Sequence, residues 1–314
     1  MKKFLLSAIS FIVAGAFVSC NQNNDITPSN SRKDVKFSSN ILKVDPPAKT
    51  RAAGEVWHQN DSIGIFMFES DATNVVDDMK NIKYTTEEGG KTGEFSADDV
   101  IIYFPDNGDK VRFMSYYPYT ASIVNNTYIV DVADQTTQAA IDLLHSFDKD
   151  ASFDKATIDK KVPLFFDHKL TKINVNIKPG SGLNSNDIIN TIVTFDGFNT
   201  QVNFNLISGE FSNHDKPEII TLLKKGTAVD DYTVSYESII IPTTDASEAK
   251  IKFDLDNGDG QDIKSNVFTW NFKDAVLEEG TEYTYNVTIN RSGIVVEAEI
   301  NDWTPTEAND IDAE

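Results

Sequence analysis

The sequence predicts an all-β protein of two tandem antiparallel β-sandwiches with a few short helices. Hydrophobic residues alternate with polar ones along many short segments, which is the period of a strand with one buried face. Clusters of Asp, Asn, Gly and Pro separate these segments, and no regular alternation of strands with helices indicates a parallel sheet. The chain has 314 residues, more than one compact core usually holds, so we expect two domains.

The amino-terminal segment has the pattern of an export signal. Two lysines precede an uncharged apolar stretch at residues 4–18, and a serine leads to Cys20, the one cysteine of the chain. This order resembles a bacterial lipobox, so we predict a signal peptide at 1–19, lipidation at Cys20 and a lipid anchor in the cell outer membrane. The alternative is an ordinary signal peptide in which Cys20 is incidental. A membrane-spanning helix needs about 20 apolar residues, and no later apolar run in the sequence is that long.

Residues 20–50 form a polar tether that carries one predicted strand. Asn, Ser, Lys and Pro dominate its composition. The residues able to pair as a strand are Val35, Phe37, Ile41, Leu42 and Val44.

The two sandwiches are predicted at residues 51–178 and 179–314. A Pro-Gly-Ser-Gly turn at 179–182 is the simplest boundary between them, although the strand predicted at 162–178 could instead open the second domain. The clearest strand alternations lie at 173–177, 202–206, 251–255, 283–289 and 294–300. Helical spacing occurs only at 135–146, for about three turns, and at 185–191, for one or two.

Charge and motifs exclude several classes of function. The net charge of −21 repels phosphate backbones, so we predict no nucleic-acid partner. No nucleophile elbow, phosphate loop or dinucleotide fingerprint occurs, and the four histidines are isolated. An Asp-rich segment at 254–262 lacks the ligand spacing of a calcium loop, which favours a hairpin turn. The sequence therefore predicts no enzyme, no metal site and no cofactor.

Several motifs follow one another in order along nearly the whole chain. They are Cys20 in its lipobox-like context, the strand at 35–41, Thr50-Arg51-Ala52 ahead of residues 57–67, the segments 111–119, 142–146 and 164–170, the strand at 283–290, and Ile300-Asn301-Asp302-Trp303. Together they resemble the fimbrillin family of type V pilus subunits and fimbrillin-like outer-membrane lipoproteins. The resemblance implies transthyretin-like sandwiches in a surface-exposed fimbrial component or adhesin.

The resemblance also implies a route of assembly. After export and lipidation, an arginine-specific protease would cut between Arg51 and Ala52, and the removable strand with Val35, Phe37 and Ile41 would leave. The vacated groove would then accept a strand from the next subunit, head to tail. The alternative is that this arginine belongs to an ordinary linker.

The role within a filament stays open at this level. The implied partners are other fimbrial subunits, with a host protein or glycan as a further candidate. Residues 303–314 are acidic and poor in apolar side chains, so we expect them to make a poor donor strand. A tip, anchor or non-polymerising role is therefore an alternative to a shaft role. A glycan-binding surface lipoprotein is the alternative, with Trp57, Trp270 and Trp303 as sugar platforms. Against it, Trp303 and the aromatic residues at 113, 116 and 117 have the character of core residues.

Overall fold

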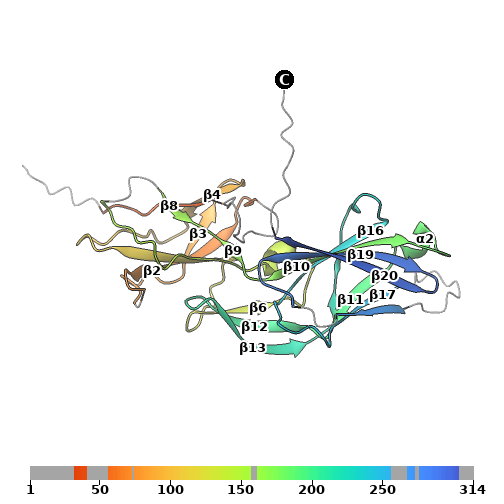
Figure 1. The fold of residues 1–314 in the computed structure, drawn as a ribbon. Coiled ribbons are helices and arrows are strands. Elements are labelled where there is room, and N and C mark those ends of the chain that lie inside the picture. Colours follow the sequence, from red (N-terminus) through yellow and green to blue (C-terminus); the bar gives the residue numbers. More distant parts are fainter. Residues whose placement is uncertain are drawn as a thin grey trace, which may run out of the picture. The chain divides into compact units, whose positions relative to one another are not determined.

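The computed structural model describes residues 32–40, 56–72, 74–156, 161–255, 267–272 and 276–303. Within these ranges the regular structure is almost entirely strand, arranged in four sheets (Figure 1). The predicted all-β class is confirmed. No helix in the described part of the chain is long and apolar enough to cross a bilayer.

The first sheet carries the amino-terminal strand. Its order is β8 (Val162–Leu164), β1 (Phe37–Asn40), β4 (Thr92–Ala97), β3 (Ile82–Thr86), β2 (Ser62–Glu69), β5 (Val111–Tyr117), β7 (Leu144–Phe147) and β9 (Asp167–His168). Neighbouring strands are antiparallel except β1 and β8, which are parallel. The two end strands, β8 and β9, are separated along the chain by Phe165 and Phe166 only. The sheet therefore curls until its ends approach each other and enclose an apolar interior.

The remaining strands form three smaller sheets. The five-stranded sheet has the order β15 (Leu223–Lys224), β16 (Val234–Ile240), β10 (Thr171–Pro179), β19 (Thr281–Asn290) and β20 (Gly293–Asp302). The four-stranded sheet has the order β14 (Ile220–Thr221), β11 (Ile192–Asp196), β17 (Lys250–Asp254) and β18 (Val267–Asn271). The three-stranded sheet joins β13 (Glu210–Pro217), β12 (Asn199–Asn205) and β6 (Thr127–Asp131), which lie side by side in Figure 1. Hence β6, from the first half of the chain, pairs with strands of the second half.

The buried apolar side chains of the described residues form two hydrophobic clusters, and β2 contributes to both. Ile63, Ile65 and Met67 point into the interior of the eight-stranded sheet. The alternate residues Phe66 and Phe68 belong to the larger cluster, which contains the apolar faces of the smaller sheets. A strand buried on both faces carries a continuous apolar run instead of an alternation, as β2 does.

A buried glutamine ties two of the smaller sheets together. The Gln135 amide nitrogen donates to the carbonyl oxygens of Val132 and Ile239 at 2.6 and 2.9 Å, and its amide oxygen accepts from the Ile239 N–H at 2.9 Å. Val132 follows β6, and Ile239 lies in β16. One side chain thereby satisfies two backbone groups of the same buried residue.

The long helix predicted at 135–146 is wrong. Only Gln138–Ile141 (α1) is helical, and the following Leu144–Phe147 forms β7 between β5 and β9. Strand pairing on both sides outweighs a weak helical spacing here. The second predicted helix is confirmed as Ser185–Ile188 (α2), where Asn184 and Asp187 form a capping box.

The strand predicted at 294–300 is confirmed as part of β20, but its buried face is only partly correct. Ile294 and Val296 are half-buried, whereas Ala298 is exposed and Ile300 is 65% exposed. The reason is that β20 lies at the edge of its sheet and hydrogen-bonds to β19 alone. The boundary at 178/179 stays a prediction, and β10 pairs with β16 and β19, which follow that boundary.

Candidate functional site

The site with the most distinctive structure is the seat of the amino-terminal strand. Phe37 of β1 lies opposite Phe95 of antiparallel β4 and opposite Val162 of parallel β8. The Val162 N–H donates to the Lys36 carbonyl oxygen at 2.7 Å. β1 therefore closes the gap between two strands that do not pair with each other in this sheet.

The residues just before β1 extend this seat. The Val35 N–H donates to the Ile102 carbonyl oxygen at 2.8 Å, and the Phe104 N–H donates to the Lys33 carbonyl oxygen at 3.1 Å. The Ile102 N–H in turn donates to the hydroxyl oxygen of Tyr84 at 3.0 Å. Burial raises the pKa of the Tyr84 phenol, so this hydroxyl stays neutral and anchors the segment beside Val35.

Alternate side chains of β1 and of the residues just before it point into the core. Val35 and Phe37 are 3% and 1% exposed, while Lys36 between them is exposed. The Phe37 ring makes edge-to-face contacts with Tyr84 and Phe113, with ring centroids 5.2 and 5.0 Å apart. Such a ring contributes about 2–3 kcal/mol by burial and about 0.5–1.5 kcal/mol from each aromatic pair.

The third inward side chain of β1 is a buried serine. Ser39 is 0% exposed and lies opposite Gly93 of β4. Its hydroxyl oxygen accepts from the Gly93 N–H at 3.2 Å. A Cβ atom on Gly93 would lie 2.8 Å from Trp57 Cδ1, 2.9 Å from Phe95 Cε2 and 3.0 Å from Ser39 Oγ. The groove is therefore narrow at this position.

An ion pair joins the two strands that flank β1. Lys161, immediately before β8, contacts the Glu94 carboxylate of β4. Glu94 lies opposite Ser38, whose side chain is on the outer face of β1. Because the Glu94 side chain is 72% exposed, this pair contributes little to stability.

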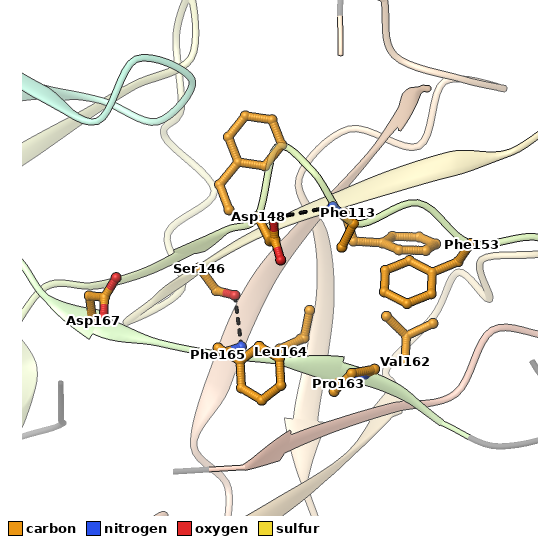
Figure 2. Close-up of a pocket in the computed structure, with 11 residues that line it drawn as sticks. Phe113, Ser146, Asp148, Phe153, Val162, Pro163, Leu164, Phe165 and Asp167 are labelled. Atoms are coloured by element: carbon orange, nitrogen blue, oxygen red, sulfur yellow. Dashed lines mark hydrogen bonds between the residues drawn. The ribbon is translucent and has the colours of Figure 1, made fainter. Parts of the chain in front are cut away.

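A cavity of about 180 Å³ borders the same site through β8 and Phe113. Figure 2 shows Val162 of β8 beside Phe153 and Phe113, and Pro163 and Leu164 also line the cavity. Its polar groups are engaged in local structure: Ser146 Oγ accepts from the Phe165 N–H at 3.0 Å, and the Asp148 carboxylate accepts from the N–H of residue 151 at 3.2 Å (Figure 2). The Asp148 carboxylate also accepts from the N–H of residue 150 at 2.9 Å. The lining is thus mainly apolar packing against the strand seat.

The predicted modification and processing residues lie outside the described part of the chain. They are Cys20, Ile41, Arg51 and Ala52. The chain is firmly held shortly after them, because Trp57 is 2% exposed and exchanges two backbone hydrogen bonds with Gly90, at 2.9 and 2.8 Å. The Trp57 ring packs edge-to-face against Phe95, Tyr117 and Phe166.

The predicted sugar-binding tryptophans and His168 are packed against other side chains of the core. Trp57 and Trp303 are buried, and Trp270 is half-buried against the core, so two of the three predicted sugar platforms are inaccessible. His168 is buried, bonds to Asp142 at 2.9 Å and stacks on the Trp303 ring at 3.8 Å. Among the described residues, no group of three or more His, Cys, Asp or Glu side chains could hold a metal ion.

His145 is also part of the core. Its Nε2–H donates to the Leu206 carbonyl oxygen at 2.7 Å. Burial, assisted by the positive charge of Lys169, lowers the pKa of His145 to about 4. The imidazole is therefore neutral at physiological pH and acts as a structural donor.

Sequence reasoning selected Val35 and Phe37 but missed Ser39 and Gly93. A signal for Ser39 is its period-two spacing after Val35 and Phe37, although serine is polar. No sequence signal distinguishes Gly93, since its role depends on which strand lies opposite.

Comparison with known proteins gives consistent results. A model of the fimbrillin-like family matches residues 50–303. A relative in Bacteroides uniformis, described as a candidate fimbrium subunit, Fim1C, is 30% identical over 295 residues, which cover 91% of this chain and 90% of the relative.

Solved structures agree with these matches. A protein described as a candidate cell adhesion protein of Bacteroides uniformis is 28% identical with a TM-score of 0.71, over 88% of this chain and 100% of that chain. Another protein so described, from Bacteroides ovatus, is 23% identical with a TM-score of 0.64 over the same shares and shows the same fold.

Proposed function

The chain belongs to the fimbrillin-like family, a family of fimbrial and cell-adhesion-like proteins, and on this premise we propose that it is a fimbrial subunit assembled by strand exchange. In this proposal the protein is exported, lipidated at Cys20 and anchored in the outer membrane. Cleavage between Arg51 and Ala52 then frees β1, and a strand of a neighbouring subunit takes its place. Its partners are other fimbrial subunits.

The observation that carries this proposal is the seat of β1. β1 and Val35 just before it belong to the segment ahead of Arg51, yet they supply three buried side chains, Val35, Phe37 and Ser39, and β1 pairs on both edges. A strand that is separable by one cut and central to the core leaves a groove with apolar walls and two unpaired edges. Such a groove is satisfied by adding a strand from another chain.

Besides Arg51 the sequence has three arginines, and all three are poorly placed for a cut that would release β1. Arg112 lies within β5, which pairs on both sides. Arg291 lies in the tight turn between β19 and β20, where its N–H donates to the Ser181 carbonyl oxygen at 3.0 Å. Arg32 precedes β1, so cleavage there would leave the strand attached to the body. Cleavage after Arg51 alone would separate β1 from the sandwich that it completes.

Limited proteolysis tests the proposal. The soluble protein from residue 21 onward is treated with an arginine-specific protease and analysed by mass spectrometry and size-exclusion chromatography, with Arg51→Ala as the matched control. We expect a cut after Arg51 in the wild-type protein, followed by exchange of the leader for an added labelled peptide of residues 33–43, and neither in the control. A wild-type protein that is cut after Arg51 but keeps its leader in an excess of this peptide would refute strand-exchange assembly and favour a non-polymerising surface lipoprotein.

A further inference from the structure

We propose that the groove occupied by β1 selects its strand by three inward side chains: an aliphatic residue, an aromatic residue and a small hydroxyl residue, each separated by one outward residue. The occupant is a strand of another fimbrial subunit that presents this pattern. The inference rests on the proposed function, since it concerns the strand that replaces β1.

The aromatic position is set by the rings around Phe37. Tyr84 and Phe113 meet its ring edge-to-face from two sides, and the backbone partners Phe95 and Val162 are themselves buried. A smaller side chain here would leave a void beside the rings of Tyr84 and Phe113. The replacing strand therefore needs a large, flat apolar side chain at this position.

The small position is set by Gly93. The space that a Cβ would occupy on Gly93 is bounded by the Trp57 and Phe95 rings and by the Ser39 hydroxyl, all at 2.8 to 3.0 Å. The Ser39 hydroxyl borders this filled space, so a branched side chain in place of Ser39 would have little room on the side of Gly93. It would also lose the hydrogen bond that Ser39 Oγ accepts from the Gly93 N–H.

The positions of Val35 and Ser39 have different surroundings, so the groove distinguishes the two ends of the strand that fills it. Val35, at the other end, is 3% exposed and lies in the apolar cluster of this sheet. A serine at that position would make fewer apolar contacts, and the Gly93 N–H that bonds to Ser39 would not be beside it. Reversing the order of the aliphatic and small residues therefore places each in the wrong surroundings. The outward positions discriminate little, because Lys36 is exposed.

Residues 304–314 do not present this pattern. They contain no aromatic side chain, and Ile311 is their one branched aliphatic residue. A second copy of this chain would therefore not fill the groove with this segment. A different subunit, with the aliphatic, aromatic and small order in an unpaired strand, is the expected partner.

Competition between peptides tests the pattern. The protein from residue 21 onward is cut with the arginine-specific protease and mixed with a fluorescein-labelled peptide of residues 33–43, whose uptake is followed by anisotropy and size exclusion. Unlabelled peptides then compete: the same sequence, Phe37→Ala, an isomer in which Val35 and Ser39 are exchanged, Lys36→Ala, and a peptide of residues 304–314.

We expect the exchanged isomer, which has the same composition, to compete at least about tenfold more weakly than the parent. Phe37→Ala should be weaker by at least about 30-fold, Lys36→Ala should remain within about twofold, and residues 304–314 should not compete. Equal competition by the parent and the exchanged isomer would overturn the pattern and leave strand exchange standing. Failure of the cut protein to take up the labelled parent peptide would refute the proposed function itself.

Discussion

Replacing Phe37 by alanine tests the central claim that β1 is part of the core. The side chain is 1% exposed and meets two aromatic rings edge-to-face. A ring of this kind buries about 200 Å², and truncating a fully buried phenylalanine to alanine costs about 3–5 kcal/mol once the cavity is included. Phe37→Ala should therefore lower the free energy of unfolding of the intact protein by about 3–5 kcal/mol.

Urea unfolding of the protein from residue 21 onward, followed by fluorescence and circular dichroism, measures this change. Lys36→Ala is the matched control, because it alters the exposed residue immediately before Phe37; we expect it to change the free energy of unfolding by less than about 0.5 kcal/mol. A Phe37→Ala variant within 1 kcal/mol of the wild type would show that β1 does not occupy the groove as described.

The same substitution has a kinetic consequence after cleavage. A loss of about 3–5 kcal/mol in strand docking corresponds to roughly a hundredfold to a few thousandfold weaker retention of the leader. Size exclusion after the arginine-specific cut should thus show the Phe37→Ala leader dissociating much sooner than the wild-type leader. Equal dissociation of the two leaders would contradict the packing argument.

Three further predictions concern the rest of the core. Gly64→Ala should destabilise the protein by about 1–3 kcal/mol in urea unfolding, because a Cβ there would overlap the buried Tyr116 ring; an unchanged midpoint would contradict this. Gln135→Ala should cost about 2–4 kcal/mol, because it leaves both backbone groups of Ile239 without this side-chain partner; a cost below 0.5 kcal/mol would show that water replaces the amide. Burial lowers the pKa of His145 to about 4, below the about 6.5 of an unfolded histidine. The folded state binds fewer protons, so stability present above pH about 6.5 should be lost as the pH falls towards 4, by about 3 kcal/mol. In His145→Gln this contribution should be absent when urea unfolding at pH 7 and pH 4 is compared; equal losses in both proteins would exclude it.

The sequence predicted the strands well because their signal is local. Where one face is buried and the other is partly exposed, as in β19, alternating residues predict both the strand and its inward face. The prediction was wrong at 135–146, where apolar residues at helical spacing belong to a single turn followed by a strand. A short apolar run does not distinguish a helix from a strand. Here the strand β7 forms because β5 and β9 pair with it on either side.

The candidate site was predicted only as far as single residues allow. Val35 and Phe37 are apolar in a polar segment, so they could be recognised without knowing their neighbours. Ser39 and Gly93 matter only as a pair across two strands, more than fifty residues apart, and one sequence contains no information on that pairing. The parallel contact of β1 with β8 is likewise a property of the topology.

The topology of β1 also bears on how an exchange would proceed. Among the described strands of this sheet, β8 hydrogen-bonds to β1 alone, so loss of β1 removes this ladder and exposes the edge of β4 at the same time. Three inward side chains would leave the core in the same step. An empty groove is therefore a high-energy state, and a strand held by several kcal/mol dissociates slowly by itself.

Cutting the chain removes the covalent link without removing these contacts, so replacement should be faster when an incoming strand pairs at one end while β1 still pairs at the other. The rate of leader release should then rise with the concentration of a matching peptide, and a rate independent of that concentration would instead indicate that the groove empties first.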